Sequence, residues 1–149
     1  MSSLSLALAA AVSTATPLSF ADLFEARAEL HPSARALALD GKRVRIEGYM
    51  ARTDEPLRGV FWLCKRPVMN DEEGDGSADL PIESILVVLS PRTREPVPTI
   101  ARALSVEGVF RVGRQVDQDG TVSSFRIILD PAPARGRTVP KFVPKEKKQ

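Results

Sequence analysis

Apolar and polar residues alternate along residues 42–51, as in a β-strand with one buried face. The same pattern returns along residues 103–112. Within these stretches, residues 44–50 and 104–110 follow one formula: apolar, polar, apolar, Glu, Gly, apolar, apolar. Glycine inside a strand marks a bulge, a bend or a close backbone approach, so Gly48 and Gly108 predict a small, strongly curved sheet. A valine at either position is expected to be unfavourable because a β-branched residue disfavours positive φ.

Three further strands are predicted. Residues 60–65 and 84–90 are apolar on both faces, which is typical of central strands, and residues 121–129 follow a turn that contains Gly120. Five strands without alternating helices predict a mainly β fold. The specific expectation is a small antiparallel five-stranded barrel of the oligonucleotide/oligosaccharide-binding (OB) type with an N-terminal helix. A β-sandwich is the alternative.

The predicted N-terminal helix begins near Ser19, which forms a possible capping box with Asp22. Apolar residues of the following ten positions lie mostly on one face. His31 precedes a proline, and a residue in that position avoids the helical region, so the helix is expected to end there. One more short helical turn is expected over residues 33–39.

Residues 1–18 are expected to form a signal or leader segment. Residues 4–12 are uncharged and almost wholly apolar, and small residues near Ala15 and Ala21 offer cleavage sites, although no Lys or Arg precedes the apolar run. The run is too short to span a bilayer. The alternative is a leader or helix of a cytoplasmic protein. The rest is expected to comprise one domain, residues 19–133, and a basic disordered tail, residues 134–149.

Charge is unevenly distributed along the chain. Residues 135–149 hold six Lys or Arg and one Glu, a net +5, so the remainder of a chain with net charge +2 carries −3. This mildly acidic remainder weakens any argument for nucleic-acid binding from overall charge. A single cysteine excludes an internal disulfide framework.

The acidic segment at residues 71–79 resembles the start of a calcium-binding loop. Its twelfth position is Ile82, where such loops place a bidentate glutamate, and no helices are predicted on either side. A mobile, solvated loop is therefore the preferred interpretation, although a looser cation site stays open. The sequence holds one histidine, His31, and no nucleophile or phosphate-loop motif. No cofactor, metal site or catalytic residue is predicted.

Cys64 and the pair Glu47 and Glu107 are further candidates for reactive groups. Cys64 lies in an apolar strand and is expected to act as a small hydrophobe, with a reactive thiol as the lesser alternative. Glu47 and Glu107 occupy equivalent repeat positions, but both fall on the polar face and are expected to be solvated or paired with arginine.

A candidate ligand-binding face is predicted on the first long strand and its end. Tyr49 shares the polar face with Arg43 and Arg45, and Arg52 follows shortly after. An exposed aromatic side chain among cations can stack on a nucleic-acid base. Four other aromatic side chains fall among apolar residues and are expected in the core: Phe61, Trp62, Phe110 and Phe125.

A family resemblance rests on residues 39–50, then Phe61-Trp62-Leu63, a proline loop and the second Glu-Gly segment. These features resemble a group of uncharacterised small exported bacterial proteins with the core pattern L-x-G-K-x-V-x-I-x-G-[YF]-M followed by F-x-L. The resemblance covers roughly residues 20–130 and implies a periplasmic or lipoprotein location. Similar proteins often carry cysteines after the second strand, where this chain has the acidic segment.

These observations favour a non-enzymatic, exported OB-like module that binds a protein or small ligand in the cell envelope, without a transmembrane span. The alternative is a cytoplasmic protein that binds single-stranded nucleic acid. A hydrolase or redox enzyme is disfavoured because no set of catalytic groups is assembled in the sequence.

Overall fold

The computed structural model describes residues 15–25, 31–53, 57–68, 80–89, 93–129 and 142–144. The described helices are a 3₁₀ turn, η1 (Phe20–Asp22), and a short helix, α1 (Ala34–Leu39). The protein is mainly β, as predicted. Its strands are β1 (Thr16–Pro17), β2 (Arg43–Met50), β3 (Val60–Cys64), β4 (Ile85–Val88), β5 (Ala103–Val116), β6 (Val122–Leu129) and β7 (Phe142–Pro144).

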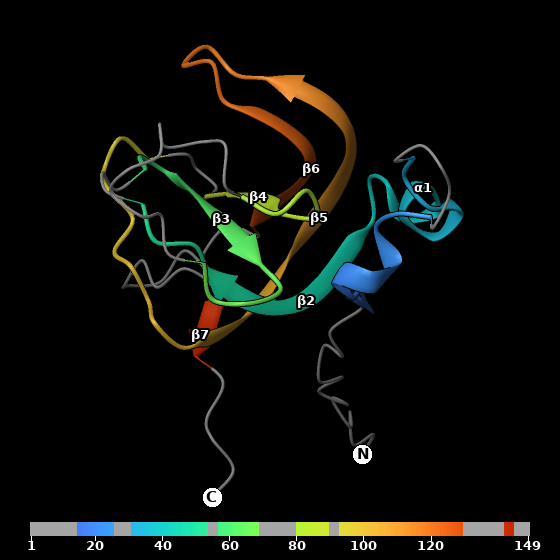
Figure 1. The fold of residues 1–149 in the computed structure, drawn as a ribbon, viewed down its shortest axis with the longest axis horizontal. Coiled ribbons are helices and arrows are strands. Elements are labelled where there is room, and N and C mark those ends of the chain that lie inside the picture. Colours follow the sequence, from blue (N-terminus) through green and yellow to red (C-terminus); the bar gives the residue numbers. More distant parts are fainter. Residues whose placement is uncertain are drawn as a thin grey trace, which may run out of the picture.

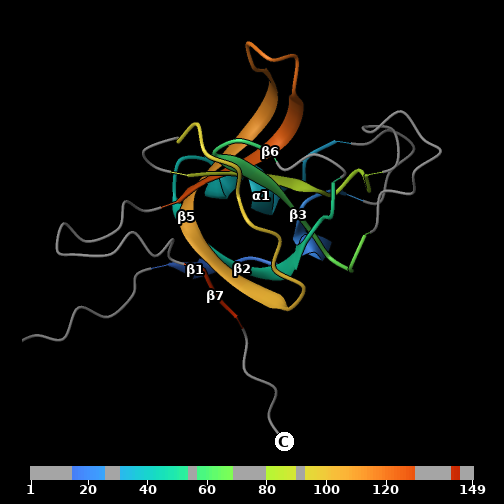
Figure 2. The same cartoon turned by 90° about the vertical axis from the view of Figure 1, so that its left-hand side faces the viewer.

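The strands form one curled sheet in the order β1-β2-β3-β4-β6-β5-β7, in which β2 also pairs with β5. This extra pairing returns the sheet on itself, so β2, β3, β4, β6 and β5 make a ring (Figure 1). Seven residue pairs join β2 to β5, whereas only Tyr49↔Cys64 and Met50↔Leu63 join β2 to β3. The far part of the β5–β6 hairpin stands away from this ring (Figure 2).

The sheet is mixed, which corrects the prediction of an antiparallel arrangement. β4 runs parallel to β6, and β1 runs parallel to β2. The reason is that the chain leaves β4 through a long connection before it enters β5. β6, the second strand of the β5–β6 hairpin, then lies beside β4 and runs in the same direction as β4. Parallel neighbouring strands need a crossover connection of this kind. The alternation of apolar residues does not indicate the relative direction of two strands.

The repeated segments lie side by side in β2 and β5, related by an approximate two-fold rotation. Val44 faces Gly108 and Gly48 faces Leu104, with the pair Ile46↔Val106 at the centre. Neither glycine is among those with positive φ, so the conformational reason given above is wrong. The alternative reason, close approach, holds: a Cβ on Gly48 would lie 2.7 Å from the Cys64 carbonyl oxygen, and one on Gly108 would lie 2.2 Å from that of Ile128.

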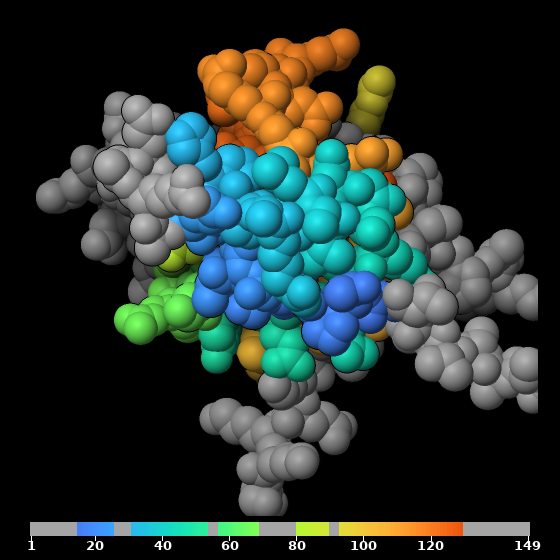
Figure 3. Space-filling model, turned by 90° about the vertical axis from the view of Figure 1, so that its right-hand side faces the viewer, coloured from blue at the N-terminus to red at the C-terminus, as the bar shows by residue number. Residues whose placement is uncertain are grey.

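One side chain in two along each strand enters a single core. Phe110 stacks on Phe125 with ring centroids 5.9 Å apart, and Phe24 meets Phe125 edge-on at 5.1 Å. The N-terminal segment and α1 cover one end of the sheet (Figure 3), where Leu23 and Ala36 are fully buried. The alternation along β2 and β5 therefore identified the buried face correctly.

The N-terminal boundary of the folded domain lies before residue 19. Thr16 and Pro17 pair with Val44 and Arg45, and the Leu18 amide donates to the Arg45 carbonyl at 2.8 Å. Leu18 itself is only 5% exposed. Residues 15–18 therefore belong with the folded domain and not with the predicted leader; the earlier residues lie outside the described part.

The predicted helix after Ser19 is reduced to the single turn η1 in the described residues. The capping box is present: the Ala21 amide donates to Ser19 Oγ at 3.2 Å, and the Ser19 amide donates to Asp22 Oδ2 at 3.1 Å. Phe24 then forms an isolated β-bridge with Pro32, which ends helical geometry. The expected turn over residues 33–39 is confirmed as α1, capped by Ser33.

The predicted tail contains a strand. β7 pairs antiparallel with residues 104–106 of β5, so residues 142–144 differ from the disorder expected for residues 134–149. The rest of that tail and the acidic segment at residues 71–79 lie outside the described residues. In the part of the chain that the structure describes, no helix has the length and apolar character needed to cross a membrane.

Candidate ligand-binding groove

A row of side chains crosses the outer surface of the sheet. Trp62 of β3 pairs with Leu86 of β4, and Leu86 pairs with Arg126 of β6. Because directly paired residues point to the same face, these three lie side by side, outside the ring. Leu86 is fully buried although it is not part of the main core cluster. This face of the sheet is therefore covered by structure and is not a simple solvated surface.

Beside this row lies a groove of about 420 Å³, here called the Trp62 groove. Its floor includes Trp62 of β3 and Ser84, which lies just before β4. Two loops and the start of β6 form its walls. The remaining lining residues are Arg52, Thr53, Leu57, Val68, Leu80, Pro81, Ile82, Gly120, Thr121, Val122, Ser123 and Ser124.

Main-chain hydrogen bonds fix the wall formed by the β2–β3 connection. The Ala51 amide donates to the Trp62 carbonyl at 2.9 Å, and the Arg52 amide donates to the Val68 carbonyl at 3.1 Å. On the neighbouring wall, the Ser84 amide and hydroxyl both donate to the Pro81 carbonyl, at 2.9 and 2.6 Å. These bonds turn the chain sharply ahead of β4 and leave the groove open beside it.

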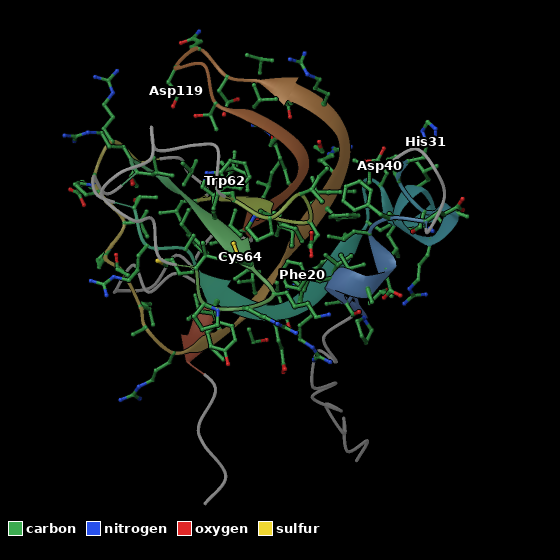
Figure 4. All side chains as sticks on the ribbon, viewed as in Figure 1. Phe20, His31, Asp40, Trp62, Cys64 and Asp119 are labelled. Atoms are coloured by element: carbon green, nitrogen blue, oxygen red, sulfur yellow. The ribbon has the colours of Figure 1, made fainter. Side chains whose placement is uncertain are left out.

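The opposite wall is the tip of the β5–β6 hairpin, which an ion pair holds against the sheet. Arg126 Nη1 lies 2.9 Å from Asp117 Oδ1, and Arg126 Nε donates to Ser123 Oγ at 2.6 Å. The two charged side chains are 9% and 14% exposed. In Figure 4, the hairpin tip at Asp119 and the indole of Trp62 lie on the same side of the molecule.

The lining of the Trp62 groove is apolar and hydroxyl-rich, with one charge. Arg52 is the single ionisable side chain among the described lining residues. Ile82 and Val122, both on the groove, are 55% and 45% exposed, and each is among the most exposed large apolar residues described. Exposed apolar side chains around a half-buried aromatic ring are typical of a binding surface.

The predicted ligand-binding face is divided by the structure. Arg43, Arg45 and Tyr49 share the outer face of β2, as the alternation indicated. Arg52 instead lines the Trp62 groove. Both strand arginines contact Glu107: Arg43 Nη2 lies 3.5 Å from Oε2, and Arg45 Nη1 lies 3.9 Å from Oε1. Glu107 thus acts as the arginine partner that one interpretation expected.

The other candidate groups do not assemble a reactive centre. Burial of Cys64 raises the pKa of its thiol, while the hydrogen bond with Ser84, 3.4 Å away, acts in the opposite direction and Glu83 raises it further. The thiol is therefore kept protonated. His31 lies at the far end of the molecule from Trp62 (Figure 4). Among the described residues, no three His, Cys, Asp or Glu side chains are grouped to hold a metal ion.

The sequence interpretation missed the principal groove residue. Trp62 was expected in the core with its apolar neighbours, but Phe61 and Leu63 point inward while Trp62 points outward and is partly exposed. No local signal marks Trp62, because residues 60–64 are apolar at every position and Val60 and Cys64, which share its side of β3, are buried. Ser84, Val122 and Ser124 carry no such signal, because the pairing of β4 with β6 alone brings them to the groove.

A second, more open hollow of about 490 Å³ lies over the irregularity in β5 between Val112 and Gln115. Arg111, Arg114 and Arg126 are among its lining residues, together with Asp40. The Asp40 carboxylate already accepts from the Val112 amide at 3.0 Å, and the Arg126 guanidinium is held by Asp117. The Trp62 groove is thus the better-defined concave site.

No protein-family model matches this sequence, and no functionally curated protein matches it. Among solved structures, the protein is similar to a DUF3299 family protein from Pseudomonas aeruginosa, with a TM-score of 0.53 and 15% sequence identity. The match covers 91% of this chain and 99% of that chain. At this identity the likeness is one of fold alone: along nearly its whole length, the protein shares the architecture of that DUF3299 family member.

Proposed function

We propose that this protein is a non-enzymatic binding module of the OB type, and that its ligand occupies the Trp62 groove. The strand order supports the OB assignment: the five strands form a ring in the order β2-β3-β4-β6-β5, in which β6 of the last hairpin lies between β4 and β5 and β5 pairs with β2. In OB folds, ligands bind across the second and third strands, between the loop after the first strand and the loop before the last. Those elements correspond here to β3, β4, the β2–β3 connection and the tip of the β5–β6 hairpin.

The single observation that carries the proposal is the coincidence of this expected site with the Trp62 groove. Trp62 comes from β3, Arg52 and Thr53 from the β2–β3 connection, and Gly120 and Thr121 from the hairpin tip. A partly exposed indole offers a large rigid contact area and a hydrogen-bond donor at little entropic cost. We therefore assign ligand contact to Trp62 and place Arg52 as the group that orients an anionic part of the ligand.

Intrinsic fluorescence tests the proposal because Trp62 is the only tryptophan of the chain. Saturable changes in its emission are expected on titration with one member of a small probe panel. The panel contains an oligothymidylate, a β-1,4-linked N-acetylglucosamine tetramer and a pool of extended peptides. A flat response to all three classes would contradict the proposal.

A pair of variants distinguishes the groove from other surfaces. Ser124→Arg places a long side chain in the Trp62 groove and is expected to abolish the titration. Ser105→Arg makes the same change on the outer face of β5, opposite Glu47, and is expected to leave it unchanged. Equal loss in both variants would place the binding site elsewhere.

Binding of single-stranded nucleic acid is the second candidate, since an aromatic ring beside an arginine can stack a base and hold a phosphate. Two observations weigh against it. The groove supplies one cation, Arg52, and the arginines on the outer face of β2 contact Glu107. An oligothymidylate that binds at physiological salt through Trp62 would establish this candidate.

The proposal includes export to the cell envelope, on the strength of the apolar run at residues 4–12. Because Ala15 is buried and Thr16–Pro17 pairs with β2, cleavage is expected before residue 15. The intact mass of the protein from its native host measures this directly. A mass that retains residues 1–14 would contradict export by cleavage, and a cut at Ala21 would contradict the assigned boundary.

A further inference from the structure

We infer that the ligand of the Trp62 groove is an extended peptide segment, which binds as an additional strand along the open edge of β6 at residues 122–124. The inference rests on the proposed function and specifies the ligand class. Addition of a strand to a sheet edge is a common mode of peptide recognition, in which main-chain hydrogen bonds supply affinity and alternate side chains supply specificity.

The first step is that part of β6 lacks a neighbour on one side. β4 pairs with β6 from Leu86↔Arg126 to Val88↔Ile128. β6, however, begins four residues earlier, at Val122. Within the described residues, no strand pairs with residues 122–124 on the β4 side, although β5 pairs with Val122 and Ser123 on the other.

The second step is the direction of the main-chain groups along this edge. The Asp117 amide donates to the Thr121 carbonyl at 2.9 Å, and the Asp117 carbonyl accepts from the Gly120 amide at 3.0 Å, so both main-chain groups of Asp117 face β6 at the hairpin end. Hydrogen-bonded and non-hydrogen-bonded pairs alternate along an antiparallel ladder. The next pair, Val116↔Val122, is therefore non-hydrogen-bonded. The amide and carbonyl of Val122 therefore point away from β5. Those of Ser124 point the same way, because main-chain groups of successive residues in an extended strand face opposite edges.

The third step is that space for a strand exists beside this edge. A straight continuation of β4 toward its N-terminus would have occupied the position next to Val122 and Ser124. The chain instead turns at Pro81, held by the two Ser84 donors, and the Trp62 groove lies in the position left open. A bound peptide would take the place that an extended β4 does not fill.

The side chains around the open edge fit an apolar peptide with an acidic residue. Val122 and Ile82 border the groove and are largely exposed, and Trp62 forms part of its floor. Alternate apolar side chains of a peptide strand would pack on this surface, while the Arg52 guanidinium would donate hydrogen bonds to a carboxylate. An oligosaccharide or a nucleic acid lacks the regularly spaced main-chain donors and acceptors of a strand that match the open edge of β6, and a polyanion would meet one cation only.

The test uses the full-length protein and a pool of blocked hexapeptides. In this pool valine, isoleucine or phenylalanine alternates with threonine or serine, and one end carries glutamate. The pool is expected to change the emission of Trp62 in a saturable manner. Two further pools carry N-methyl groups on the odd or on the even residues, and one of these patterns removes the amide donors that face β6. The pool with that pattern is expected to bind at least about tenfold more weakly than the parent pool.

Two valines of the hairpin provide a matched pair of variants. Val122→Pro removes the amide donor from the open edge, whereas Val116→Pro makes the same change at the residue directly opposite, whose amide points to the other side of the hairpin. Both valines are about half exposed. Val122→Pro is expected to lower peptide affinity about tenfold or more, and Val116→Pro to leave it within about twofold.

Each outcome decides the inference. If the N-methylated pools bind as well as the parent pool, or if both proline variants bind equally well, strand addition is wrong. If Val122→Pro fails to fold, as judged by its circular dichroism and melting curve, the N-methylated pools still decide. If the oligothymidylate or the tetrasaccharide binds through Trp62 and the peptides do not, the ligand class is wrong while the proposed function stands. If no probe changes the emission of Trp62, both the peptide inference and the proposed function are wrong.

Discussion

Gly108→Val is expected to remove the folded state at room temperature or to lower its free energy of unfolding by more than about 3 kcal/mol. A Cβ at this position would meet the carbonyl oxygen of Ile128 at 2.2 Å and its carbonyl carbon at 2.8 Å. Both are main-chain atoms of β6, so they cannot yield by a rotamer change. Relief would require that β5 and β6 separate at the pairs Gly108↔Leu129 and Val109↔Ile128.

Urea unfolding of four variants tests this explanation. Gly48→Val is expected to be less severe, since its shortest contact is 2.7 Å and two of its three neighbours are side-chain atoms. Gly108→Ala should already be strongly destabilising, because the clash involves Cβ alone. Gly120→Ala is the control: φ is +85° there but nothing lies within 4 Å, so a loss of about 1–2 kcal/mol from backbone strain is expected. Equal losses for Gly108→Ala and Gly120→Ala would contradict the steric account.

The second large effect is expected from the ion pair between Arg126 and Asp117. Removal of one partner, as in Asp117→Ala, leaves a guanidinium buried against the sheet and should destabilise the protein by about 3–5 kcal/mol. Arg126 Nη2 already has no hydrogen-bond partner and is inaccessible to solvent. Loss of the Asp117 contact would therefore leave only the bond from Nε to Ser123 among the hydrogen bonds described for this side chain.

Thermal melts and Trp62 emission report this change at two levels. The single variant is expected to melt at lower temperature and to shift the emission of Trp62 toward that of an exposed indole, because Gly120 and Thr121 leave the groove wall with the hairpin tip. The double variant Asp117→Leu with Arg126→Met replaces both charges by apolar groups and should recover much of the stability. A double variant less stable than Asp117→Ala would show that the unpaired Arg126 guanidinium is not the cause of the loss.

Period-two alternation predicted the major strands because burial of one face imposes it. Residues 42–51, 60–65, 84–90, 103–112 and 121–129 correspond closely to β2 through β6. β5 continues to Val116 because its last residues extend the hairpin beyond the core, where the apolar period no longer applies. Thr16–Pro17 was missed because two residues cannot display a period, and its pairing with β2 depends on a partner far along the chain.

The candidate site was predicted less well than the fold because it depends on register. The outer face of β2 was visible in the alternation, so Arg43, Arg45 and Tyr49 were placed together correctly. The groove requires that Trp62 pair with Leu86 and that Leu86 pair with Arg126, and nothing local specifies either pairing. Val122 is likewise exposed because β4 does not extend alongside it. The turn at Pro81, which precedes β4, limits the length of that strand.

The pairing of β2 with β5 also governs the order of events during synthesis. Its partners, from Tyr49↔Ala103 to Arg43↔Val109, are 54 to 66 residues apart along the chain. Such distant contacts are formed late, because loop closure must precede any gain from them. While the ribosome still holds residues 103–109, β2 has an unsatisfied edge and the ring cannot close. The nascent chain therefore cannot complete its native fold until residues 103–109 are free to pair with β2.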